Sequence, residues 1–162
     1  MNTFSNYKIL VLGLGNLLMG DDGIGVLAVE ELKKSEWPPG VHILEVGTSV
    51  FYYLAEICRA QHLIAVDALS AGGAPGSIYR LDWEDIFCGP EKGAHAISLP
   101  GLIKMARAMT GLPGSAAIIG VEPGNLGLGE PLSFAVREAL PVILRRVTKE
   151  VEKIKRGTLT VR

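Results

Sequence analysis

The chain has little cysteine and lacks any long apolar run. Its two cysteines, Cys58 and Cys88, show neither the spacing of a metal site nor that of a disulfide framework. No stretch reaches the roughly 20 apolar residues that a membrane helix needs. The polar start, residues 1–7, has no apolar signal segment. We therefore expect a cytoplasmic globular protein with reduced cysteines, in which Cys58 is a buried small hydrophobe.

An excess of charge of either sign is also missing. Sixteen basic residues nearly balance seventeen acidic ones, so there is no sign of a surface for nucleic acid. Apolar residues make up 48% of the chain, which excludes an intrinsically disordered protein. A length of 162 residues suits one domain with its own core. We expect a monomer with one domain over residues 1–162, flexible at 1–6 and 157–162, and no membrane or nucleic-acid partner.

Strand and helix patterns alternate along the chain. Short apolar runs predict strands over residues 7–12, 41–46, 62–68, 77–81 and 116–121. Longer periodic segments predict helices over residues 23–34, 51–60, 98–109 and 133–155, while 83–94 reads as irregular. This alternation predicts an α/β fold, a three-layer α/β/α sandwich of the phosphorylase/hydrolase-like type. Its sheet is expected to be five-stranded, mostly parallel and twisted, with helices on both faces.

Two carboxylates follow strands that should lie in this sheet. Asp22 comes after the first strand and Asp67 ends the third. The carboxyl ends of parallel strands share one edge, so the two side chains should converge, and close carboxylates need a compensating cation. His95, just before a helix, should reach the same edge. Such a set suits nickel, zinc or manganese and leaves positions open for water or substrate.

Each of these residues also has a plainer interpretation. Asp21 and Asp22 fit a helix cap, Asp67 fits a turn, and His95 fits a surface position. We expect Asp21 to cap the helix that follows, so that Asp21→Asn costs about 0.5–1 kcal/mol. Asp22→Asn should instead spare folding and remove activity.

A dinucleotide site is the first alternative for the glycine turn. Gly13 and Gly15 follow a strand, and Glu45 stands where an acidic residue would hold a ribose. Leu18 occupies the position of the third glycine, and the adjacent Asp21 and Asp22 would repel a pyrophosphate. The pattern therefore argues against a nucleotide.

Several motifs, in order along the chain, resemble one known family. They are Ile9–Asn16, Asp21–Val26, Gly47-Thr48, Ala65–Ala68, Gly73–Ser77, His95 with its following helix, and Gly120–Pro123. Together they resemble the hydrogenase maturation proteases, which process the large subunit of nickel–iron hydrogenases. The chain departs from the family at Asp22, where several relatives have glutamate, and in the loop before the last helix.

The resemblance implies an endopeptidase that removes the C-terminal extension of a hydrogenase large-subunit precursor after nickel insertion. It carries the metal-binding and catalytic roles to Asp22, Asp67 and His95, which would ligate the nickel held by the precursor. Water would attack the peptide bond, activated either by the metal or by a carboxylate in an aspartic-type reaction. Glu45 and Glu122 are secondary candidates, interpreted as structural or orienting. A maturation chaperone or metal-binding module that holds the precursor without cutting it stays open.

Overall fold

The fold is built around one five-stranded sheet, described here by a computed structural model that covers residues 7–86 and 98–159. In spatial order its strands are β2 (Val41–Gly47), β1 (Tyr7–Leu14), β3 (Ala60–Ala68), β5 (Ser115–Val121) and β4 (Ile78–Asp82). The first four are parallel, and β4 runs antiparallel to β5 at one edge. The predicted, mostly parallel sheet is confirmed.

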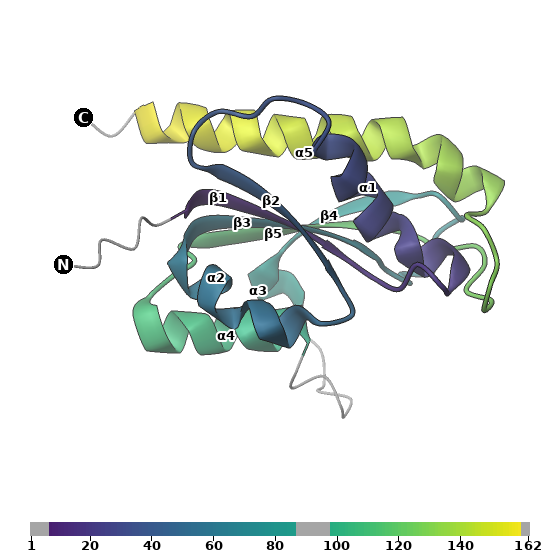
Figure 1. Ribbon diagram of the computed structural model, residues 1–162, viewed down its shortest axis with the longest axis horizontal. Coiled ribbons are helices and arrows are strands. Elements are labelled where there is room, and N and C mark those ends of the chain that lie inside the picture. The colour runs from purple at the N-terminus through teal and green to yellow at the C-terminus, as the bar shows by residue number, and fades with distance from the viewer. Residues whose placement is uncertain (1–6, 87–97, 160–162) are drawn as a thin grey trace.

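Helices cover both faces of the sheet, as the α/β/α prediction requires (Figure 1). One face carries α1 (Ile24–Leu32) and α5 (Phe134–Leu159), and the other carries α2 (Leu54–Arg59), α3 (Trp83–Ile86) and α4 (Leu99–Thr110). Short 3-10 turns, η1 (Gly20–Gly23) and η2 (Val50–Tyr53), precede α1 and α2.

The strand β1, which lies between β2 and β3, is buried on both sides, which explains its continuous apolar sequence. Ile9 and Val11 pack into the core beneath α1 and α5, whereas Leu10 and Leu12 pack into the core on the opposite face. All four side chains have no exposed surface. Successive strand residues point to opposite faces, so one strand anchors both helical layers.

Several elements differ from the sequence predictions. The helix expected over residues 51–60 consists of the 3-10 turn η2 followed by α2, and residue 60 already belongs to β3. β1 continues to Leu14, past the expected end at residue 12.

Residues 83–86 form the short helix α3 where an irregular segment was expected. The helix expected at residue 23 begins as the 3-10 turn η1 and becomes α-helical at Ile24. The last helix continues through Pro141 and ends at Leu159, beyond the expected end at residue 155. Among the described residues, no helix is both long and apolar enough to span a bilayer.

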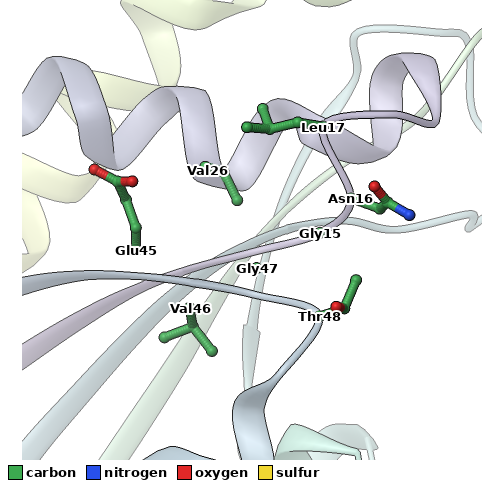
Figure 2. A pocket seen from close by; sticks show the side chains of 8 residues that line it. All are labelled: Gly15, Asn16, Leu17, Val26, Glu45, Val46, Gly47 and Thr48. Atoms are coloured by element: carbon green, nitrogen blue, oxygen red, sulfur yellow. The ribbon is translucent and has the colours of Figure 1, made fainter. Parts of the chain in front are cut away.

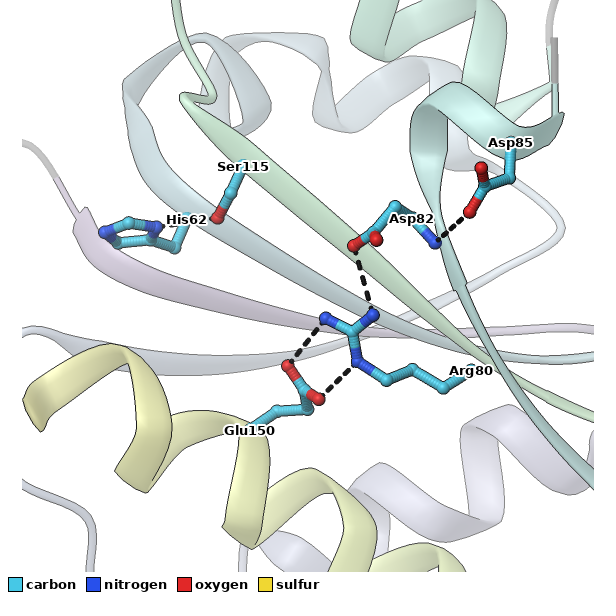
Figure 3. A network of polar contacts seen from close by, with 6 residues as sticks. All are labelled: His62, Arg80, Asp82, Asp85, Ser115 and Glu150. Carbon is cyan, nitrogen blue, oxygen red and sulfur yellow. Dashed lines mark hydrogen bonds and ion pairs between the residues drawn. The ribbon is translucent and has the colours of Figure 1, made fainter. Parts of the chain in front are cut away.

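The edge strand β4 is tied to α5 by one arginine (Figure 3). Arg80 donates from Nη2 to Glu150 Oε2 at 3.2 Å and from Nη1 to Asp82 Oδ1 at 3.1 Å, and its Nε also contacts Glu150. Glu150 belongs to α5, so the ion pair joins the antiparallel strand to the longest helix. This contact lies away from the carboxyl ends of the parallel strands.

Candidate functional site

Asp22 lies in η1, directly above the carboxyl end of β1. Its Oδ2 accepts a hydrogen bond of 2.8 Å from the Asn16 N–H. Gly15 makes this approach possible, because a Cβ there would lie 1.8 Å from the Asp22 carbonyl oxygen and the φ of Gly15 is +124°. Only glycine tolerates both the contact and that backbone angle. The glycine turn therefore fixes Asp22 over the strand end.

Asp67 lies near the end of β3, the strand next to β1. Its Oδ1 is 3.7 Å from the Cβ position of Gly15, the same glycine that contacts Asp22. Burial, and then the negative charge of Asp22, raise the pKa of Asp67 to about 7, although the Ala68 N–H opposes the shift. The structure thus brings together the two predicted carboxylates. Their role as metal ligands stays a prediction.

The other predicted groups contribute differently. His95 and Cys88 lie outside the described residues. Within residues 7–86 and 98–159, no three His, Cys, Asp or Glu side chains gather in a group that could hold a metal ion. Burial raises the pKa of the Cys58 thiol in α2, which disfavours the nucleophilic thiolate. The described part of the site is therefore a pair of carboxylates.

Asp21 has a role that the sequence did not indicate. Its carboxylate is fully buried. Oδ2 accepts hydrogen bonds from the N–H groups of Gly124 and Asn125 at 2.7 and 2.8 Å, and from the Ser133 hydroxyl at 2.7 Å. Oδ1 accepts the Ser133 N–H at 2.7 Å. Asp21 therefore holds the glycine-rich loop between β5 and α5 against η1.

The expectation that Asp21 caps the helix after it is wrong. No side chain makes a capping hydrogen bond at the start of η1 or α1, and the carboxylate sits instead at Ser133, just before α5. Burial alone would raise the pKa of Asp21, but the hydrogen bonds from Asn125, Ser133 and Gly124 outweigh it and lower the pKa. These partners are 103 to 112 positions away in sequence, and no local signal points to them.

Glu122 and Glu45, the two secondary candidates, bind side chains and backbone of neighbouring segments. Glu122 is 7% exposed and accepts hydrogen bonds from the Ala71 N–H at 2.8 Å and the Tyr79 hydroxyl at 3.0 Å. The N–H of Ala71 is the main cause of the lowered pKa of Glu122. Glu45 forms an ion pair of 3.0 Å with Lys33. The contacts of Glu122 support the orienting interpretation, since they fix the loop that follows β3.

A groove of about 350 Å³ opens at the glycine turn that follows β1 (Figure 2). It lies where β1 and β2 end, and its lining consists of Gly15, Asn16, Leu17, Val26, Glu45, Val46, Gly47 and Thr48. Gly15 and Asn16 belong both to this groove and to the surroundings of Asp22. The groove therefore shares two of its lining residues with the surroundings of Asp22.

Comparisons with known proteins agree on one family. A family model described as hydrogenase maturation protease matches residues 26–150. The chain is 32% identical over 161 residues to the hydrogenase 2 maturation protease of Escherichia coli, covering 94% of this chain and 98% of that protein. It is 34% identical over 146 residues to the hydrogenase expression/formation protein HoxM of Azotobacter vinelandii, covering 85% of this chain and 70% of that protein. The solved structure of the hydrogenase maturating endopeptidase HybD from E. coli is similar, with a TM-score of 0.81 at 29% identity, over 90% of this chain and 93% of that one.

Proposed function

This chain belongs to the hydrogenase maturation protease family, and we propose on that premise that it processes a nickel–iron hydrogenase large-subunit precursor. The reaction is removal of the C-terminal extension after nickel has been inserted. Asp22, Asp67 and His95 recognise the nickel, which is carried by the precursor and belongs to the substrate. Nickel in the precursor is thus the signal that permits the cut.

The observation that carries the proposal is the unfavourable carboxylate pair. Asp22 and Asp67 flank the same glycine, and burial together with the charge of Asp22 raises the pKa of Asp67 to about 7. Two carboxylates held this way repel each other, and a bound cation offsets that repulsion. Oxygen ligands with open positions around them suit a metal that is shared with a substrate.

Two routes for the chemical step remain consistent with these side chains. In the first, nickel bound by Asp22 and Asp67 polarises the scissile carbonyl or activates the attacking water. In the second, one carboxylate accepts the proton of the water, and the raised pKa of Asp67 suits a general base near neutral pH. In both routes, the groove beside Asn16 holds the chain to be cut.

The test is a cleavage assay on cognate precursor, with and without inserted nickel, followed by mass spectrometry. The wild-type protein should release one C-terminal peptide from the nickel-loaded form only. Asp22→Asn and Asp67→Asn should each lower the rate at least about 100-fold, as loss of a group that stabilises the transition state does. Asp82→Asn is the matched control, because Asp82 is an exposed aspartate on β4 whose side chain forms an ion pair with Arg80.

Three outcomes separate the alternatives. Cleavage by both site variants at the wild-type rate would remove the nickel-recognition role of the carboxylates. Tight binding of the loaded precursor without a cut would favour the non-cleaving chaperone. Equal cleavage of nickel-free and nickel-loaded precursor would show that the reaction does not require the metal.

A further inference from the structure

Two loops at the carboxyl end of the sheet expose four large leucines. Leu17 and Leu18, between β1 and η1, are 49% and 65% exposed. Leu126 and Leu128, between β5 and α5, are 45% and 75% exposed. We call these four side chains the leucine patch. Single exposed leucines are ordinary on protein surfaces, whereas a contiguous group marks an interaction site.

The two loops form one surface although they are about a hundred residues apart in sequence. The Gly129 N–H donates to the Leu18 carbonyl at 2.8 Å, and the Asp21 N–H donates to the Asn125 carbonyl at 2.7 Å. Gly20 lies so close that a Cβ there would be 2.5 Å from the Asn125 carbonyl oxygen. Both loops lie at the same end of the molecule in Figure 1, next to the start of α5.

The buried carboxylate of Asp21 holds this pair of loops in place. It sits at the end of the first loop and accepts the N–H groups of Gly124 and Asn125 from the second. Hydrogen bonds to a buried charge are among the stronger ones in proteins. The hydrogen bonds to Asp21 therefore fix the backbone of both loops, so the fold itself keeps the leucine side chains exposed.

The leucine patch adjoins the candidate site. Leu17 lines the same groove as Asn16, whose N–H binds the Asp22 carboxylate (Figure 2). Residues 16–19 and 126–129 contain no charged side chain. A partner that covers these loops would meet an apolar surface at the leucines, beside the exposed Glu130 that follows Gly129, and it would also lie next to the groove.

Resting on the proposed function, we propose that the leucine patch docks an apolar surface on the folded body of the large-subunit precursor, beside the extension that is cut. The groove holds a short piece of chain, and the patch adjoins it, with Leu17 belonging to both. Contact outside the groove would let the protease select the folded, nickel-loaded precursor over an unfolded chain with the same end. The patch is thus a specificity surface, separate from the reacting groups.

The test is the double variant Leu18→Lys/Leu128→Lys, which changes the most exposed leucine of each loop. Its Kd and KM for nickel-loaded precursor should rise at least tenfold, while kcat at saturating precursor stays within twofold of wild type. The matched control is Met105→Lys/Met109→Lys on α4, which adds the same charge at apolar side chains that are 42% and 64% exposed. This control should leave Kd, KM and kcat unchanged. If the lysine variant fails to fold by circular dichroism, Leu18→Ala/Leu128→Ala replaces it, with a rise of about threefold expected.

The outcomes distinguish this proposal from the function on which it rests. Wild-type affinity in the leucine variant, or an equal loss in the α4 variant, overturns the docking role while cleavage by the wild-type protein stands. A wild-type protein that neither binds nor cuts any nickel-loaded precursor overturns the proposed function and the docking role together. Sedimentation of the wild-type protein as a dimer and of the leucine variant as a monomer, with precursor binding unchanged, would assign the patch to a second copy of this chain.

Discussion

At the residue scale, Asp21 and Asp22 are adjacent and chemically identical, yet the structure gives them opposite surroundings. Asp21 is fully buried and surrounded by donors, which keep its pKa low. Asp22 is partly exposed and faces another carboxylate, Asp67. The fold stabilises the charge of the first residue with hydrogen bonds, whereas the second leaves its carboxylate accessible to a ligand. This difference assigns one to structure and the other to the candidate site.

Asp21→Asn should destabilise the protein by about 3 kcal/mol, because buried donors lose a charged acceptor and the new amide places its own donors against them. This exceeds the 0.5–1 kcal/mol expected for a simple helix cap. Urea unfolding measures the change. Ser133→Ala is the graded comparison, since it removes only the hydroxyl donor and should cost about 1 kcal/mol. An Asp21→Asn cost no larger than that of Ser133→Ala would contradict the role of Asp21 as the main anchor.

Asp67 should make the stability of the protein depend on pH. Because its pKa is raised to about 7 in the folded state, and is about 4 in an unfolded chain, the folded protein holds this proton more tightly. The stabilisation that this proton gives the folded protein is complete below pH 4 and is lost as the pH rises through 7. Asp67→Asn has no such proton, so its free energy of unfolding relative to wild type should rise by about 3–4 kcal/mol between pH 4 and pH 8. Chemical unfolding at a series of pH values checks this, and a difference independent of pH would show that Asp67 ionises normally.

At the element scale, the position of α1 depends on its close approach to the sheet. A Cβ on Gly25 would lie 2.2 Å from the carbonyl oxygens of both Leu14, the last residue of β1, and Val66, near the end of the neighbouring strand β3. Gly13 makes the matching contact from β1, with a Cβ position 2.4 Å from the Gly25 carbonyl oxygen. Gly13, one of the two glycines that suggested a nucleotide site, therefore serves together with Gly25 the packing of α1 on β1 and β3.

Gly25→Ala should destabilise the protein by more than about 3 kcal/mol, because backbone atoms rather than a flexible side chain block the new methyl group. Gly157→Ala is the matched control within α5. A Cβ at Gly157 meets nothing within 4 Å, so this change should stabilise the protein by about 0.5–1 kcal/mol through helix propensity. Thermal unfolding of the two variants checks the contrast, and a Gly25→Ala protein as stable as wild type would mean that α1 shifts freely.

Long elements were predictable from the sequence and short ones were not. The buried strands have apolar runs that end at polar or glycine residues, so β1 and β3 were recognised with Asp67 at the end of the latter. α3 and the 3-10 turn η1 are only four residues long, and such a length carries no periodicity. Pro141 lies in the interior of α5 without ending it, because packing of the long apolar face against the sheet outweighs the cost of the proline.

At the scale of the whole molecule, the convergence of Asp22 and Asp67 was predictable because parallel sheet topology brings the carboxyl ends of β1 and β3 to one edge. The glycine turn at Gly15 then holds Asp22 over that edge. The partners of Asp21 and Glu122 were not predictable, since most of them are backbone N–H groups of distant loops. Every residue except proline carries such a group, so nothing in the sequence marks which ones a buried carboxylate will bind. The sequence thus locates the candidate site, but it does not predict the hydrogen bonds that hold the surrounding loops in place.

The contact between Asp21 and Ser133 joins residues 112 positions apart, and this has a consequence for biosynthesis. At about 5–20 residues per second, the donors for Asp21 are made roughly 6–22 s after the carboxylate itself. During that interval a nascent chain carries Leu17 and Leu18 on a loop without its partner loop. The protease therefore completes the surroundings of its site only when the last helix is being synthesised, and the growing chain is most in need of protection from aggregation before then.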